Sequence, residues 1–143
     1  MADFTPIQPG SKTLIRYNTQ GSISIPLTAV GGAVNMGQAV RMNGNLGCSP
    51  AGAADFPIGT VEVAAAQGKK ATVRLNADCT VEGVANGAAL AAGAFVRQDG
   101  TFAADGSPNY VVAAAGNYAC GVVLNGAASG GAITVAHVAP FKV

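Results

Sequence analysis

Hydrophobic and polar residues alternate along several short stretches of the chain, and turn-forming residues end each stretch after a few positions. The segments SISI (residues 22–25) and CTVE (residues 79–82) both alternate with period two, which is the spacing of a half-buried β-strand. The segment 59–75 shows the same period on both sides of a Gly-centred turn. Its apolar positions on period two are Val61, Val63, Val73 and Leu75. The pattern predicts short strands joined by tight turns.

The chain contains an internal repeat. GQAVRMNGNL (residues 37–46) resembles GAFVRQDGTF (residues 93–102) at an offset of 56 residues, within an ungapped alignment of 24 positions that has seven identities. A second pair of blocks, residues 59–75 and 121–137, matches at an offset of 62, so the second copy carries six additional residues within the range 103–120. These two matches in the same order indicate a tandem duplication.

The duplication suggests three parts: an N-terminal lead of residues 1–21, a first β repeat of residues 22–77, and a second β repeat of residues 78–143 with a short tail. In each repeat an Ala/Gly stretch leads to Asn43-Gly44 or Asp99-Gly100, dipeptides that suit the centre of a type I′ hairpin turn. The sequence leaves open whether the two repeats share one core or form two.

The predicted fold is all-β, a small barrel or a sandwich built from the duplicated unit. Runs of Ala at residues 64–66, 88–92 and 113–115 favour helix by propensity, but they are too short and too often interrupted by Gly to form stable helices. We therefore expect one or two short helical turns at most.

Composition narrows the choice of partners. Only 10% of the 143 residues are charged, against about 25% in an average soluble domain, and the net charge is +1. A surface with so few charges tends to associate, which favours a protein covered by partners over a soluble monomer solvated by its Ser, Thr, Asn and Gln residues. A net charge of +1 gives no footprint for the phosphates of nucleic acid.

The sequence shows no signal for export or membrane insertion. The segment MADFTPIQPG has no basic residues followed by an apolar run, and the uncharged stretch 106–141 is broken by Gly, Ser, Asn and Pro. Cys48, Cys79 and Cys120 have no close spacing, so we expect free thiols in a reducing cytoplasm, with a bridge between Cys79 and Cys120 as the alternative.

Reactive residues are scarce, and we expect no catalytic, metal or cofactor site. The one histidine, His137, should share a strand face with Ile133 and Val135 at the edge of a core. Glu62 and Glu82 lie in predicted strands and could face one another as paired carboxylates, but alternation toward solvent explains both. The Gly-rich runs lack the spacing of phosphate-binding loops.

Several residues are candidates for contacts. Lys69-Lys70 falls at a hairpin tip, either as a solvated turn or as a contact for an acidic partner surface. Arg41 and Arg97 are equivalent in the repeat, which favours a shared packing or ion-pair role. Tyr110 and Tyr118 lie in or beside the insertion, where a sugar would bind if the chain is a carbohydrate-binding module. The candidate contacts with a partner or with another subunit are Lys12, Arg16, Lys69, Lys70, Tyr110 and Tyr118.

The phrases IGTVEVAAAQGKKATVRL (residues 58–75) and VEGVANGAALAAGAFV (residues 81–96) are similar to the small Gly/Ala/Val-rich β proteins that decorate or cement the capsids of tailed bacteriophages. The pattern of a Gly, a Val-rich strand, an AAxG turn and a VxV strand occurs twice, although Leu75 and His137 replace its last Val. The matching positions are Gly59, Val61, Ala65, Ala66, Gly68 and Val73, and then Gly121, Val123, Ala127, Ala128, Gly130 and Val135.

The resemblance implies a non-enzymatic virion protein, made in the host cytoplasm, that binds the major capsid protein on the outer capsid surface as a homotrimer. It implies no cofactor, no membrane and no direct contact with nucleic acid, and the lead of residues 1–21 becomes a candidate arm for gripping the capsid. The alternative is a carbohydrate-binding or fibre module on a phage or cell surface.

Overall fold

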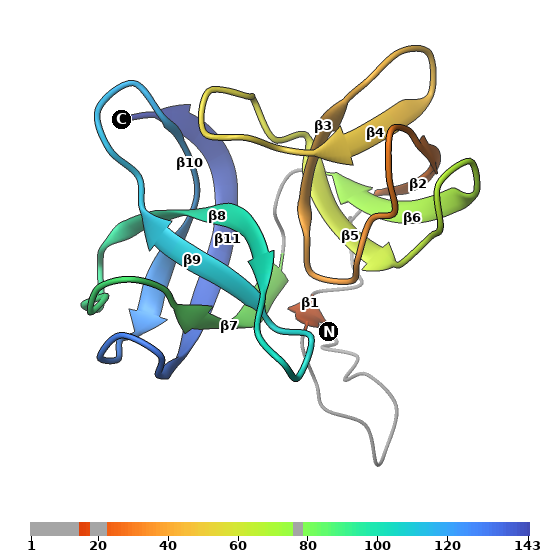
Figure 1. Ribbon diagram of the computed structural model, residues 1–143. Helices are drawn as coiled ribbons and strands as arrows, with labels where there is room; N and C mark the ends of the chain where they lie inside the picture. Colours follow the sequence, from red (N-terminus) through yellow and green to blue (C-terminus); the bar gives the residue numbers. More distant parts are fainter. Residues whose placement is uncertain (1–14, 18–22, 76–78) are drawn as a thin grey trace, which may run out of the picture.

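The computed structural model describes the backbone of residues 15–17 and all atoms of residues 23–75 and 79–143. Within these ranges the chain forms eleven β-strands and no helix, and Figure 1 shows the strands gathered into two barrels that lie side by side. The prediction of an all-β fold is therefore confirmed, in the form of barrels.

The first barrel contains five strands in the closed order β2-β4-β3-β5-β6. All neighbours in it are antiparallel except β2 and β4, which run parallel and close the barrel. A closed barrel leaves no long unpaired edge, which suits a chain with few charges to protect an edge from pairing with other chains. The strands are β2 (Ser24–Ala29), β3 (Ala39–Met42), β4 (Gly47–Pro50), β5 (Gly59–Val63) and β6 (Lys70–Leu75).

The second barrel repeats this arrangement with the order β7-β11-β10-β8-β9, and a parallel pairing of β7 with β9 closes it. One further strand, β1 (Ile15–Tyr17), pairs antiparallel with β7, with Ile15 opposite Val81. The strands of the barrel are β7 (Cys79–Ala85), β8 (Phe95–Phe102), β9 (Pro108–Val112), β10 (Tyr118–Asn125) and β11 (Ala132–Lys142).

Strand registers show that the two barrels are copies of one unit. The pair Val61 and Val73 in the first barrel corresponds to Val123 and Val135 in the second, at the offset of 62. Even the isolated bridge between Val34 and Ala65 has its counterpart between Leu90 and Ala127. The duplication read from the sequence is thus present in the hydrogen-bonding pattern.

Each barrel encloses its own cluster of buried side chains, with Leu27, Val40 and Val61 in the first and Ile133 and Val135 among those of the second. Ala39 and Met36 are exceptions because they belong to the first repeat but pack against the second cluster. The two repeats therefore form two cores that are in contact.

The two cores fill equivalent space with different residues. Tyr110 lies across Gly83, where an added Cβ would come within 2.4 Å of the tyrosine ring. The counterparts of these residues in the first barrel are Cys48 and Leu27, both fully buried. The second barrel thus combines a large tyrosine with a glycine that has no side chain, where the first barrel combines a small cysteine with a leucine. The total side-chain volume stays similar, and both interiors remain closely packed.

The predicted type I′ turns are wrong. Asn43 does not have a positive φ; the left-handed residues in the first hairpin are Gly44 and Leu46. Asp99-Gly100 does not form a turn at all, because it lies inside β8 at a register irregularity. The Asp99 carboxylate accepts hydrogen bonds from Asn86 Nδ2 (2.6 Å) and from Thr101 N (2.8 Å), and these contacts hold the bulge.

The six additional residues of the second copy make its hairpin longer. Gln98 opposite Tyr110 corresponds to Met42 opposite Cys48, so the insertion lies between β8 and β9, where Ala103 N–H donates to the carbonyl of Ser107. This position falls within the range expected from the sequence.

The predicted period in segment 59–75 holds for Val61 and Val73, which are fully buried, but not for Val63, which is exposed. A bulge between Val61 and Val63 shifts the pairing of β5 with β6 and turns the second valine outward. Hydrophobic alternation alone contains no sign of such a bulge.

Candidate functional site

A buried polar network joins the two barrels. Gln98 of β8 donates from Nε2 to the carbonyl of Gly37 (2.6 Å), and its Oε1 accepts the backbone N–H of Ala39 (2.7 Å). The same Nε2 lies 3.0 Å from the hydroxyl of Tyr110. Gln98 thus serves as the hydrogen-bond partner of two backbone groups of the first barrel, the carbonyl of Gly37 and the N–H of Ala39. Burying these groups without such a partner would be unfavourable.

The network continues through His137 of β11. Its Nε2 lies 2.7 Å from the Tyr110 hydroxyl, and its Nδ1 lies 2.6 Å from Oγ1 of Thr60 in β5 of the first barrel. Because Gln98 donates to the tyrosine oxygen, the tyrosine hydrogen is free to point at His137 Nε2. This assignment leaves the proton of a neutral imidazole on Nδ1, where it donates to Thr60.

His137 is held neutral by its surroundings. Its side chain is buried as predicted, on the same strand face as Ile133 and Val135, and burial lowers its pKa from 6.5 to about 4. Burial also raises the pKa of Tyr110 well above its ordinary value of 10. Both groups are therefore uncharged at neutral pH and act through hydrogen bonds alone.

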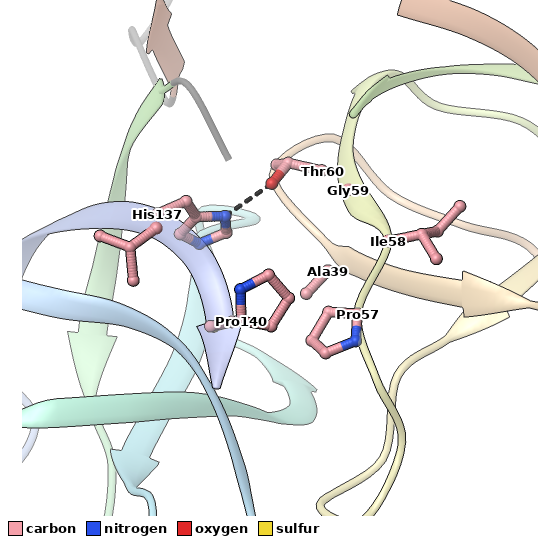
Figure 2. Close-up of a pocket in the computed structure, with 9 residues that line it drawn as sticks. Ala39, Pro57, Ile58, Gly59, Thr60, His137 and Pro140 are labelled. Carbon is pink, nitrogen blue, oxygen red and sulfur yellow. Dashed lines mark hydrogen bonds between the residues drawn. The ribbon is translucent and has the colours of Figure 1, made fainter. Parts of the chain in front are cut away.

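Figure 2 shows the pocket beside this histidine, lined by residues of both barrels that include Pro57, Ile58 and Pro140. About 10 Å³ of it is free, room for one water molecule and far less than the roughly 300 Å³ of a small ligand site. A wider hollow on the first barrel is lined mainly by alanines, namely Ala33, Ala64, Ala65 and Ala66, with no charged side chain. Neither place gathers groups suited to chemistry.

Tyr110 needs a correction, because it was a candidate contact residue and a candidate sugar platform. Its side chain is 0% exposed, with its ring over Gly83 and its hydroxyl in the network. A ring at the centre of the folded second barrel cannot touch a partner or a sugar.

Tyr118 lies at the contact of the two barrels. Its ring packs edge-on against Phe56 of the first barrel, with 5.5 Å between ring centroids, and its backbone N–H donates to the carbonyl of Ala53. The residue is half-buried.

Two of the four basic candidates lie on the surface. Lys69 and Lys70 are exposed where the β5–β6 turn meets β6, as expected for a hairpin tip. Arg16 lies in β1 with its backbone opposite Thr80, and Lys12 is outside the described residues. Their role as contacts stays a prediction.

Arg41 and Arg97 do share one structural role. Arg41 Nε lies 3.1 Å from Asp55 Oδ2, and Arg97 Nε lies 3.3 Å from Oδ1 of Asn117, the counterpart of Asp55 in the second copy. Each arginine also donates from Nη1 to the carbonyl of the next residue. The duplicated hairpin thus fixes the following loop in both barrels, by an ion pair in one and by a hydrogen bond from the arginine to a neutral amide in the other.

The carboxylates do not form a catalytic pair. Glu62 pairs with Arg74 in the first barrel, whereas Glu82 accepts from Thr134 Oγ1 (3.1 Å) in the second. Among the described residues no three His, Cys, Asp or Glu side chains gather as a metal site. All three cysteines are buried thiols outside any disulfide, so the alternative of a Cys79–Cys120 bridge does not occur. No helix in the described ranges is long and apolar enough to span a membrane.

Sequence reasoning missed the polar network. Thr60 and His137 are 77 residues apart, and Gln98 and Ala39 are 59 apart, so neither pair shares a local motif. The available signal was the repeat itself: at these positions one copy has Gln98 and His137, and the other has Met42 and Leu75. A polar residue in one copy where the other copy has an apolar residue indicates that the two barrels use different sides of the repeated unit for their contact with one another.

Comparisons with known proteins give a relationship of fold. No protein-family model and no curated protein matches the chain. Among solved structures, the chain is similar to the head fiber gp8.5 N base of bacteriophage phi29, with a TM-score of 0.54 and 15% sequence identity. The match covers 85% of this chain and 98% of that chain. The two proteins therefore share a fold over nearly the whole length of the phage chain.

Proposed function

We propose that this chain is a structural protein of a phage virion, which binds the outer surface of the capsid and stabilises the shell. The observation that carries the proposal is the fold shared with a phage head fiber base, which includes both barrels and not one barrel alone. Fold by itself does not determine function, so the surface chemistry matters as well.

The surface supports a role in binding. Large hydrophobic side chains are exposed on both barrels, among them Ile23, Leu46, Phe56, Phe95 and Leu124. The exposed ring of Phe95 packs against Phe141, with 4.9 Å between the ring centroids, and adjoining exposed apolar side chains are typical of surfaces that partners cover. Many weak contacts repeated over a symmetric lattice add to a high overall affinity without any reactive group.

The partners in this proposal are the major capsid protein and further copies of the chain, which we expect to form a homotrimer. Light scattering over a concentration series would measure the native mass. Co-sedimentation with mature capsids assembled from the major capsid protein of the same genome would measure binding, and the temperature of capsid disruption would measure stabilisation. The proposal predicts saturable binding and a higher disruption temperature. A chain that never sediments with capsids would overturn it.

The alternative of a fibre module also gains support from the likeness, since the similar protein is described as the base of a head fiber. In that case the chain would attach a protruding segment to the head. Negative-stain images of decorated capsids would show thin projections for a fibre and a smooth added layer for a cement protein. The carbohydrate-binding version loses one of its two candidate residues, because Tyr110 is buried, whereas Tyr118 is half-buried.

A further inference from the structure

The contact between the two barrels uses different sides of the repeated unit. The first barrel contributes Ala39, at the start of β3, and Thr60 of β5, whereas the second contributes Gln98 of β8 and His137 of β11. Because the strand registers match at offsets of 56 and 62, each of these positions has a counterpart in the other barrel. Each barrel therefore has a second side equivalent to one that is already used within the chain.

In the second barrel, the counterparts of Ala39 and Thr60 are Phe95 and Val122. They lie directly opposite one another on β8 and β10. Phe95 is 46% exposed, and Phe141 packs edge-on against it with 4.9 Å between the ring centroids. We call Phe95 and Val122, together with Phe141 of β11, the β8/β10 face, and all three side chains are apolar.

In the first barrel, the counterparts of Gln98 and His137 are Met42 and Leu75. Ile23, the counterpart of Cys79, lies beside them, since its carbonyl accepts the N–H of Leu75. Met42 is 42% exposed and Ile23 is more exposed still. We call Ile23, Met42 and Leu75 the β2/β3/β6 face, and it is apolar as well.

The internal contact between the barrels is polar, whereas both unused faces are apolar at the equivalent positions. Inside the chain, Thr60 meets His137, and Gln98 meets the backbone of Ala39. At the unused equivalent positions Val122 would meet Leu75, and Phe95 would meet Met42. Both members of each pair are apolar in the second case, and a Met beside an aromatic ring is a favourable contact in its own right.

We propose that a second copy of this chain docks head to tail, with the β8/β10 face of one molecule on the β2/β3/β6 face of the next. This contact repeats the internal contact of the barrels and removes large apolar side chains from water, which favours association. Such an interface is heterologous, so successive copies close into a ring if the rotation allows it. The inference rests on the self-association in the proposed function and identifies the faces that would carry it.

The test uses the full-length chain and three lysine variants at exposed positions. Phe95→Lys alters the β8/β10 face, Met42→Lys alters the β2/β3/β6 face, and Val63→Lys is the matched control on an exposed valine of β5 outside both faces. Sedimentation equilibrium would measure the association constant of each, with circular dichroism and thermal unfolding to verify the fold. We expect at least a tenfold weaker association for each face variant and no change for the control.

A mixture of the two face variants gives the sharper readout. Each variant retains one intact face, so Phe95→Lys chains and Met42→Lys chains should form one-to-one dimers that grow no further. A contact between identical patches would instead be insensitive to Met42→Lys, and that result would overturn the proposal. A wild-type chain that is monomeric at about 100 µM would also overturn it.

Failure here is distinct from failure of the proposed function. If the wild-type chain is monomeric but binds capsids, and Phe95→Lys abolishes that binding, the β8/β10 face contacts the capsid protein. The head-to-tail contact is then wrong and capsid binding stands. If capsid binding is absent while the face variants behave as expected, self-association stands and the capsid proposal is wrong.

Discussion

Acid should destabilise this protein through its one histidine, beginning as the pH falls below 6.5. Burial lowers the pKa of His137 from 6.5 to about 4, so the folded chain resists taking up the proton that the unfolded chain accepts below pH 6.5. Between those two values the unfolded state binds more protons, and stability falls as the pH falls. The stabilisation is fully present above pH 6.5 and is lost toward pH 4.

The size of the effect follows from the shift. One pKa unit corresponds to about 1.4 kcal/mol, so lowering the pH from 7 to 5 should cost about 2 kcal/mol of unfolding free energy, and the complete loss is about 3 kcal/mol. Protonation also disturbs the network, because both ring nitrogens then donate and Tyr110 cannot donate to Nε2. Asp99 loses its contribution only in more acidic solution, since hydrogen bonds from Thr101 and Asn86 outweigh burial and hold its pKa below 3.8.

Urea unfolding at several pH values between 7 and 5 would measure this dependence, with His137→Gln as the matched control. Glutamine retains a donor and an acceptor but does not titrate. The variant should be less stable at pH 7 and should show almost no change in stability over this range, whereas the wild-type protein should lose about 2 kcal/mol. Equal slopes for the two proteins would refute the reasoning, because the titrating group would then lie elsewhere.

Three further predictions concern packing and the repeated contacts, all measured by urea unfolding. Gly59→Ala should destabilise the chain by about 2 kcal/mol or more, since the added Cβ would come within 2.2 Å of a carbonyl oxygen. The control Gly32→Ala has open space around it and should change stability by less than about 1 kcal/mol, so equal effects of the two variants would contradict the close approach at Gly59. Tyr110→Phe should cost about 1 to 3 kcal/mol, because it leaves two buried groups without their partner, and an unchanged stability would show that the network is not needed. Asp55→Asn should cost less than about 1 kcal/mol, because Asn117 performs the same role in the second barrel, and a larger loss would mean that the charge itself is required.

The sequence was sufficient for the elements and their repetition. Period-two alternation placed β7 and the burial of His137 correctly, because one face of each strand is buried in a barrel. Of the strand predicted at residues 22–25, only Ser24 and Ile25 lie in β2, and Ile23 is exposed. The offsets of 56 and 62 anticipated which strands correspond. These features depend on local patterns and on comparison of the chain with itself.

Other features depend on contacts between distant residues. Asp99-Gly100 has the composition of a turn, but Asn86, 13 residues away, binds the carboxylate and keeps the segment inside β8. Tyr110 seemed exposed because it follows an insertion, yet Gly83 opposite it leaves the space that its ring fills. The burial of the Tyr110 ring depends on the absence of a side chain at Gly83 on a neighbouring strand. The hydrophobic pattern along the strand of Tyr110 does not contain that information.

The way each barrel closes has a consequence for the order of folding during synthesis. β2 pairs with both β4 and β6, and β7 pairs with both β9 and β11, so neither ring of strands is complete before its fifth strand has been made. The ribosome would finish the first set at Leu75 and reach His137 roughly 3 to 12 s later at typical elongation rates. During that delay Thr60 and the backbone of Ala39 have no partner from the second barrel, and the newly made first barrel exposes to chaperones the side that the second will cover.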